Sequence, residues 1–289
     1  MPVNLSLIIV SWNVRDHLRA NLARLFDIHA RARFEVLVVD NGSIDGTPAM
    51  IRREFPQVHL IQNDGNRGFA HACNQGLALA EGEVFVLFNP DMVMGEGVLD
   101  RVYETLVAQK DIGGMGVRLT RADGTVVASV RRDPGFTDQL AILLKLPHLF
   151  PRVVDRYLAC DFDYGTPQNV EQLRGSFLAF RRDVFLQVGP LDEKNFFIWF
   201  EDVDYCRRLR QAGYRLWYDA SMSCMDLVGQ SFAQQPTHVK QARFSLSLAR
   251  YFRAWHPAWQ AAVFYALRPL TIAMGALADL VRVHSRLWK

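Results

Sequence analysis

The first hundred residues alternate short apolar runs with amphipathic stretches. The apolar runs cover residues 5–10, 34–39, 58–61 and 83–88, and helical patterns follow up to about residue 26, over 45–55 and over 68–80. Runs that are apolar at almost every position are typical of parallel strands buried on both faces. The pattern therefore predicts an α/β fold with a mostly parallel central sheet and helices on both of its faces.

The second half of the chain is less regular. Residues 113–119 and 125–130 are predicted to pair as a β-hairpin around a turn at 122–124, whereas residues 131–172 show no firm period and predict no element. The other expected elements are strands at 176–180, 214–218 and 222–225, a helix from about 183, and a helix over 201–212 closed by Gly213.

Residues 236–289 are helical in pattern and rich in Ala and Leu, which sets them apart from a larger domain over 1–235. Arginines and aromatic residues recur along this extension, and Arg268, Pro269 and Asp279 interrupt its apolar run. Because these interruptions disfavour a full span, we expect amphipathic helices that lie on an anionic membrane surface. The alternatives are that the extension caps the larger domain or forms a homodimer interface.

Polar residues gather where the predicted strands end. The residues concerned are Ser11, Asn13, Asp40, Asn41, Asn63, Asn89 and Asp91. In open α/β sheets the ligand crevice lies outside the carboxyl ends of the strands, and packing does not explain polar residues there. The sequence therefore predicts a ligand site at this edge of the sheet.

Besides Asp91, an acidic cluster lies at residues 197–204, where three carboxylates follow a run of aromatic residues. A carboxylate beside apolar surface is partly desolvated, which raises its pKa and makes it a better proton acceptor. Together with Asn89-Pro90-Asp91, this cluster suggests an active site with a metal and a base. The alternative is an acidic first turn of a helix, with Asp204 paired to Arg207 or Arg208.

Composition narrows the class of protein. The 289 residues are half hydrophobic, enough for a large core, and the net charge of +3 is too small to indicate a nucleic-acid partner. The four cysteines are scattered, so we expect free buried thiols in a reducing compartment. The apolar stretch at 5–12 is too short for a signal peptide, which makes the cytoplasm the default location. Without G-x-G-x-x-G after the first strand, a dehydrogenase is disfavoured.

A series of motifs, read in order, resembles glycosyltransferase family 2. The first half carries SLIIVSWN at 6–13, VVDNGSIDGT at 38–47, NRGFA at 66–70, NQG at 74–76 and NPD at 89–91. The second half carries RGSFL at 174–178, VGPLDE at 188–193, FIWFEDVD at 197–204, CRR at 206–208 and GQS at 229–231. Each motif is weak alone, but their order over about 5–232 is specific, and bacterial rhamnosyltransferase-type members are the most similar.

The resemblance implies a Rossmann-like GT-A fold with a nucleotide-binding part over about 1–118 and an acceptor part over about 119–235. It implies inverting, metal-dependent transfer of a sugar, with rhamnose as one candidate, from a dTDP- or UDP-sugar. The acceptor would be a cell-envelope, O-antigen or exopolysaccharide glycan, and a lipid-linked acceptor would account for the basic, aromatic extension.

For the donor, the resemblance places Val10, Ser11 and Asn13 at the nucleoside pocket, with Asp40 accepting the imide N–H of uracil or thymine. An Asx-turn or helix cap is the alternative for Asp40. Asn66, Arg67 and Gly68 precede a helix, so their N–H groups and the guanidinium would meet the diphosphate. The alternative for Arg67 is a solvated loop residue.

Asn89-Pro90-Asp91 stands at the position of the family's D-x-D motif, with Asn89 as its first member. Asp91 would bind Mg²⁺ or Mn²⁺, which prefer oxygen ligands and neutralise charge on the leaving diphosphate. A plain turn is the alternative. Asp226 replaces the His of the family's H-x-x-G-x-S motif, and this change means a carboxylate metal ligand, altered metal use or lost activity.

Asp202 matches the family's general base, which deprotonates the acceptor hydroxyl in one inverting displacement. Arg174 and Gly175 lie where the family approaches donor sugar and acceptor. Trp199, Phe200 and Glu201 are assigned to the acceptor side. For the two aromatic residues the alternative is packing in the core, and for Glu201 it is orienting the loop and helix.

Two other functions remain open. A sugar nucleotidyltransferase would need a basic, Gly-rich loop after the first strand, and residues 11–14 do not provide one. A catalytically silent GT-A module would serve assembly or membrane recruitment, and Asp226 is consistent with such decay. The presence of Asp91 and Asp202 argues against it.

Overall fold

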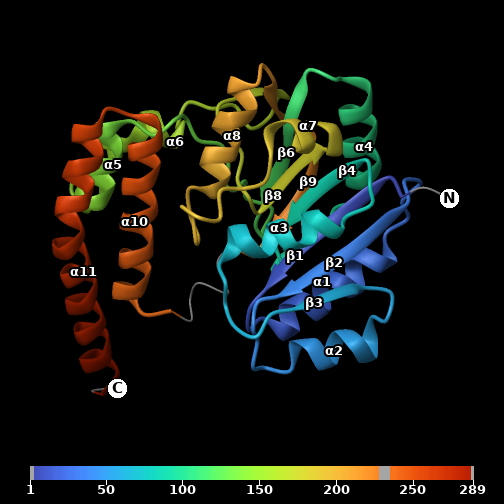
Figure 1. The fold of residues 1–289 in the computed structure, drawn as a ribbon, viewed down its shortest axis with the longest axis horizontal. Coiled ribbons are helices and arrows are strands. Elements are labelled where there is room, and N and C mark those ends of the chain that lie inside the picture. The colour runs from blue at the N-terminus through green and yellow to red at the C-terminus, as the bar shows by residue number, and fades with distance from the viewer. Residues whose placement is uncertain (1–2, 228–234, 288–289) are drawn as a thin grey trace.

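The computed structural model describes residues 3–227 and 235–287, with side chains described up to residue 280. A nine-stranded sheet forms its centre in the order β3-β2-β1-β4-β8-β6-β9-β5, with β7 paired to β9 (Figure 1). The strands are β1 (Leu5–Ser11), β2 (Phe34–Asp40), β3 (His59–Gln62), β4 (Val84–Phe88), β5 (Met92–Val93), β6 (Ile112–Thr120), β7 (Gln168–Val170), β8 (Phe177–Arg181) and β9 (Arg215–Asp226).

The strand directions confirm the predicted mostly parallel sheet. β1, β2, β3 and β4 pair in parallel, and β6 pairs in parallel with β9. β8 lies between these two groups and is antiparallel to both β4 and β6, so the two groups point the same way. The short strands β5 and β7 run against β9. The predicted strands of the first half are all present.

Helices cover both faces of the sheet, as the continuous apolar strands require. One face is packed by α1 (Arg15–Asp27), α2 (Thr47–Glu54) and α4 (Val98–Ala108). The other is packed by α3 (Phe69–Leu79), α7 (Arg182–Val188) and α8 (Glu201–Gln211). Successive strand residues supply the two cores: Leu7 and Ile9 face one and Ile8 the other, and all three are almost fully buried.

The predicted hairpin around residues 122–124 is wrong in its second strand. The turn forms, but residues 125–130 contribute only an isolated bridge between Thr120 and Val126. Residues 125–127 bond to Arg121 and Leu119 at the end of β6, but the chain then leaves β6, and Arg131 forms a bridge with Gln172 instead. The two strands expected at 214–218 and 222–225 are one strand, β9, with a register shift opposite Val117 and Arg118.

Residues 131–172, for which no element was predicted, form several short elements. These are α5 (Phe136–Leu143), the 3₁₀ turns η1 (Leu146–His148) and η2 (Pro151–Val154), α6 (Asp155–Leu158) and β7. The cysteine expectation needs one correction: Cys73, Cys206 and Cys224 are free and buried, but Cys160 is exposed.

The C-terminal extension forms two antiparallel helices beside the sheet, α10 (Thr237–Trp255) and α11 (Ala258–Leu287) (Figure 1). α10 packs Leu248, Tyr251 and Phe252 against Phe196 and Phe200, which precede α8. The indole N–H of Trp255 donates a 2.8 Å hydrogen bond to Asp204. The extension therefore packs directly on the segment that carries the predicted acidic cluster.

Arg181, the last residue of β8, anchors the end of α4. Its side chain is 2% exposed and donates to the backbone carbonyls of Leu106, Lys110 and Ile112 at 2.9–3.1 Å. Carbonyls at a helix C-terminus have no partner within the helix, and this guanidinium satisfies them.

We expect Arg181→Met to destabilise the fold by about 3 kcal/mol, because several buried carbonyls lose their donor. Urea unfolding followed by circular dichroism measures the loss. Arg53→Met is the matched control: its side chain is 74% exposed and pairs only with Glu54 among the described ion pairs, so the change should stay within about 0.5 kcal/mol. Equal effects of the two substitutions would contradict the anchoring role.

Candidate active site

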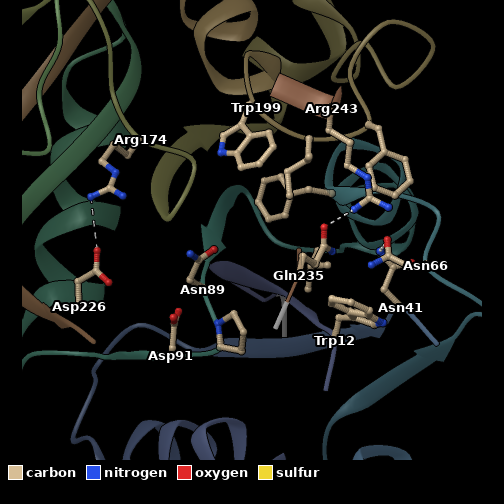
Figure 2. A pocket seen from close by; sticks show the side chains of 15 residues that line it. Trp12, Asn41, Asn66, Asn89, Asp91, Arg174, Trp199, Asp226, Gln235 and Arg243 are labelled. Carbon is tan, nitrogen blue, oxygen red and sulfur yellow. Dashed lines mark hydrogen bonds and ion pairs between the residues drawn. The ribbon is translucent and has the colours of Figure 1, made fainter. Parts of the chain in front are cut away.

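A cavity of about 300 Å³ lies at the carboxyl ends of β1, β2 and β4, where the sequence predicted a ligand site. Its lining comes from Val10, Trp12, Asn41, Asn66, Phe69, Asn89, Pro90, Asp91, Arg174, Phe197, Ile198, Trp199, Asp226, Gln235 and Arg243. Figure 2 shows Asn89 and Asp91 between the Arg174–Asp226 pair on one side and Trp12, Asn41 and Asn66 on the other. We call this the first cavity.

Two carboxylates reach the first cavity from neighbouring segments: Asp91 directly precedes β5, and Asp226 ends β9. β5 pairs with β9 so that Met92 lies opposite Asp226, and the N–H of Leu227 donates to the carbonyl of Asp91 at 3.1 Å. Asp91 and Asp226 are buried to 5% and 3% exposure, and Arg174 lies 3.7 Å from the Asp226 carboxylate.

These two carboxylates fit a hard divalent cation by ligand type. Within the described residues, no group of three His, Cys, Asp or Glu side chains is placed to hold a metal ion. A cation beside Asp91 and Asp226 would therefore need further oxygen ligands from a bound diphosphate or from water.

Ser11 and Asp40 lie side by side where β1 and β2 end, paired in register and fully buried. Asp40 Oδ2 accepts the N–H of Ser43 at 3.0 Å, which is the turn-holding role considered as the alternative. Among the described residues, Asp40 Oδ1 and Ser11 Oγ make no hydrogen bond. Burial raises the pKa of Asp40, against the hydrogen bonds from Ser43. Neither residue is in the lining of the first cavity, although their chain neighbours Val10 and Asn41 are. Buried polar atoms without partners so close to a cavity are typical of a site that a ligand completes.

Asn41 and Asn66 organise the wall next to these strand ends. The Asn41 amide donates to Asn66 Oδ1 at 3.2 Å and to the Gly68 carbonyl at 3.1 Å, and it accepts the N–H of Arg67 at 3.0 Å. Gly68 has φ +93°, and a Cβ there would lie 2.5 Å from the carbonyl oxygen of Phe197. Only glycine therefore allows this close approach.

The residues before α8 adopt an unusual backbone. Trp199 and Phe200 both have positive φ, +62° and +68°, which costs free energy for bulky side chains. The cost is offset by packing, because Phe200 lies against Phe244 and Tyr251 with ring centroids 5.8 and 5.3 Å apart. Phe200 is 4% exposed and belongs to the core.

Asp202 faces a second cavity rather than the first. Its carboxylate accepts the N–H of Gly175 at 2.9 Å and that of Val203 at 2.8 Å. The lining of this second cavity is Arg121, Val127, Ala128, Ser129, Arg131, Tyr157, Gln172, Leu173, Arg174, Trp199, Phe200, Asp202, Val203 and Phe244. Arg174 and Trp199 line both cavities and mark their boundary.

The structure thus brings many predicted residues to one place and leaves others aside. Val10, Asn66, Asn89, Asp91, Arg174, Trp199 and Asp226 line the first cavity, and Asp202 and Phe200 border the second. Asn13 is outside both linings; its side chain accepts the N–H of Ile44. The side chain of Arg67 borders a separate hollow with His71 and Glu193.

Sequence reasoning missed several lining residues. Trp12 sits inside a recognised motif but was not assigned to the site, and Asn41 was among the polar strand-end residues but was given no individual role. Arg243 comes from α10, lies 4.3 Å from the Phe197 ring centroid and donates to Gln235, so the extension contributes to the cavity. Gln172 and Arg131 fall in the segment without a firm period, where no sequence signal marked them.

Comparison with known proteins agrees with this architecture. Residues 6–154, more than half of the chain, match the model of the family described as glycosyl transferase family 2. The chain belongs to glycosyltransferase family 2. It is 30% identical over 280 residues to an N-acetylglucosaminyl-diphospho-decaprenol L-rhamnosyltransferase of Mycobacterium tuberculosis, covering 91% of this chain and 89% of the relative. It is also 29% identical over 143 residues to a glucosyl-dolichyl phosphate glucuronosyltransferase of Haloferax volcanii, covering 48% of this chain and 39% of that one.

Solved structures confirm the GT-A fold of this glycosyltransferase. A mannosyltransferase of Pyrobaculum calidifontis with GDP-Man and Mn²⁺ superposes with a TM-score of 0.58 at 20% identity, covering 99% of this chain and 77% of that one. GalNAc-T7 with UDP, GalNAc and Mn²⁺ gives 0.68 at 15% identity, covering 93% and 51%.

Glu201 is buried beside Asp202 with 5% exposure, and its Oε2 atom has no hydrogen-bond partner among the described residues. Burial, and then the Asp202 charge, raise the pKa of Glu201 well above its ordinary value of 4.5. The folded protein therefore binds a proton that the unfolded chain releases above pH 4.5. Stability falls as pH rises from 4.5 towards the raised pKa.

We expect Glu201→Gln to be more stable than the parent at pH 7–8, by about 1 kcal/mol or more, because the buried charge is gone. The difference should shrink towards pH 4.5, where the parent side chain is neutral when folded. Urea unfolding of both proteins at several pH values measures it. A variant that is less stable than the parent at pH 8 would show that the carboxylate is compensated.

Proposed function

We propose that this glycosyltransferase moves a sugar from a pyrimidine nucleoside diphosphate to a lipid-linked glycan with inversion. The observation that carries the proposal is the contact of two cavities at Arg174 and Trp199. The first has buried polar atoms and a carboxylate pair at the strand ends, which suits a nucleoside diphosphate. The second has Asp202, which suits an acceptor hydroxyl.

On the donor side, Asp40 accepts the imide N–H of the base, and Ser11 lies beside it. The buried Asp40 Oδ1 and Ser11 Oγ, which have no partner among the described residues, support this assignment. A pyrimidine imide offers one N–H donor between two carbonyl acceptors, so a carboxylate oxygen and a hydroxyl are suitable partners. Asn66, which lines the first cavity, would meet the diphosphate. The N–H groups of Arg67, Gly68 and Phe69 already donate to Asn41, Asn66 and Phe197, so the expected N–H contacts of residues 66–68 with the diphosphate are not part of this proposal.

Asp91 and Asp226 would hold Mg²⁺ or Mn²⁺ against that diphosphate. The metal, when bound, neutralises negative charge on the leaving nucleoside diphosphate. Arg174 lies 3.7 Å from Asp226, so it either adds to this neutralisation or turns towards the transferred sugar. Asn89 belongs to the turn that positions Asp91, and that turn is fixed because Asn21 donates to the carbonyls of Asn89 and Met92.

Asp202 acts as the general base. Burial raises the pKa of Asp202, with the N–H of Gly175 opposing the shift, so the carboxylate is a stronger base than an exposed one. It takes the proton of the acceptor hydroxyl as that oxygen attacks the anomeric carbon. The attack comes from the second cavity and the diphosphate leaves into the first, on the opposite face, which inverts the configuration.

Rhamnose from a dTDP donor is the proposed sugar, since the M. tuberculosis relative is named as an L-rhamnosyltransferase acting on a diphospho-decaprenol. The product would extend a cell-envelope glycan.

An acceptor of this kind sits at a membrane, and we assign contact with the cytoplasmic face to α11. Ala258–Leu280 is long and apolar enough to cross a membrane by length and composition, and 22% of that window is buried. Trp259, Leu270, Leu277 and Leu280 are each more than half exposed.

We expect Asp202→Asn to reduce transfer at least a thousandfold while leaving donor binding unchanged, because the amide keeps the shape but cannot take the proton. Radiolabelled transfer and calorimetric titration of the donor separate the two effects. In the parent, the rate should fall as pH drops through the raised pKa of Asp202. Asp27→Asn, at a carboxylate that is 76% exposed, is the control. Transfer within tenfold of the parent would remove Asp202 as the base.

We expect Asp91→Asn to weaken dTDP or UDP binding at least tenfold in the presence of Mn²⁺ and to change it little in EDTA, because a carboxylate ligand is lost. Titrations with UDP, dTDP, GDP and ADP, with and without Mn²⁺ or Mg²⁺, test the donor class at the same time. If the parent bound the nucleotides equally well with and without metal, Asp91 would not be a metal ligand. Failure of all four nucleotides to bind would favour a catalytically silent module.

A further inference from the structure

The second cavity is rich in positive charge. Arg121, Arg131 and Arg174 line it, against one carboxylate, Asp202. Arg174 is partly neutralised because it pairs with Asp226. Arg121 is exposed and held at the rim by a tight turn, with its guanidinium 3.2 Å from the Thr125 hydroxyl. A neutral sugar does not require this charge.

Gln172 supplies a second feature of a binding site. Its side chain is 3% exposed and lines the second cavity, and its Nε2 atom makes no hydrogen bond within the described part of the chain. A buried amide donor without a partner is costly. A hydroxyl or carbonyl oxygen of a bound molecule would satisfy it.

Arg131 lies next to Gln172, because the two residues form an isolated antiparallel bridge. Residues paired in this way project their side chains to the same side, and both reach the cavity. One nitrogen of Arg131, Nη1, is fixed by the carbonyls of Ala128 at 2.8 Å and Val130 at 2.7 Å. In the described residues, its Nε and Nη2 donate no hydrogen bond. The guanidinium is therefore held in place by Nη1, and its Nε and Nη2 donors can bind a ligand.

We propose that the second cavity recognises an acceptor sugar that carries a diphosphate, with Gln172 bonded to the sugar and Arg131 and Arg121 to the diphosphate. This deepens the proposed function and rests on it, since the cavity is taken as the acceptor site. The planar guanidinium matches phosphate oxygens better than an ammonium group does. In this arrangement Asp202 would meet the attacking hydroxyl, and Arg121, an exposed residue of the same lining, would lie on the lipid side of the diphosphate.

The names of the two curated relatives are consistent with this chemistry. One name has a diphosphate between sugar and decaprenol, and the other has a single phosphate between sugar and dolichol. The competing explanation is that the arginines bind the donor's diphosphate across the boundary at Arg174. A third explanation is that Arg131 only holds the loop at residues 128–130.

Binding measurements test the proposal without requiring turnover. The probes are hexyl-diphospho-N-acetylglucosamine and hexyl N-acetylglucosaminide, which differ only in the diphosphate, titrated calorimetrically into the full chain. We expect the parent to bind the charged probe at least tenfold more tightly, and Arg131→Gln to remove that preference. Arg131→Lys should restore part of it, and Gln172→Met should weaken both probes alike.

The controls separate the competing explanations. Arg132→Gln should leave the preference intact, because Arg132 pairs with Asp161 and lies outside the cavity lining. Asp91→Asn should also leave it intact. A preference lost in Asp91→Asn and kept in Arg131→Gln would place the diphosphate in the first cavity and overturn the proposal. Equal binding of both probes by the parent would overturn it as well.

Transfer assays with dTDP-rhamnose then show which proposal fails. If Arg131→Gln lowers kcat/KM for the charged acceptor tenfold or more and leaves the neutral acceptor unchanged, both stand. A loss that is equal for both acceptors would assign Arg131 to holding the loop. Selective binding of the charged probe without any transfer would refute the proposed reaction and leave the diphosphate site standing.

Discussion

The site depends on how the segment before α8 is held. The N–H of Phe69 donates to the Phe197 carbonyl at 2.7 Å, and Ser247 Oγ of α10 donates to the Ile198 carbonyl at 2.8 Å. These two hydrogen bonds, one from each side, offset the free-energy cost of the positive φ values at Trp199 and Phe200. That cost is about 1–3 kcal/mol for each residue. Without these hydrogen bonds the segment would adopt a less strained backbone, and the Asp202 carboxylate would move away from the Gly175 N–H and the second cavity.

The hydrogen bond from Ser247 also explains why the C-terminal extension belongs to the site. α10 supplies the apolar wall on which Phe200 packs and places Arg243 in the first cavity. A helix pair that only touched the membrane would not need Trp255 bonded to Asp204. The extension thus joins the site to α11, the helix that is proposed to meet the membrane.

The sheet sets the positions of the two cavities relative to each other. β8 is inserted antiparallel between β4 and β6, and the chain leading into it carries Gln172, Arg174 and Gly175. That segment separates the two cavities. β9 returns Asp226 beside Asp91 through its pairing with β5. The insertion of β8 thus positions the segment between the two cavities, and the pairing of β9 with β5 positions the two carboxylates of the first.

The local pattern of apolar and polar residues was enough to predict the first four strands and the position of the first cavity. Continuous apolar runs predicted β1 to β4, and polar residues at their ends predicted the first cavity, because strand burial and strand ends are properties of neighbouring residues. Motif order identified the family from the sequence. The second strand of the hairpin at 125–130 was predicted wrongly because the local pattern does not show that the chain leaves β6 and that Arg131 pairs with Gln172. Gln172 and Arg131 were invisible for the same reason: their contact is a bridge across 41 residues, and long-range pairing is decided only when the whole sheet and its covering loops are assembled.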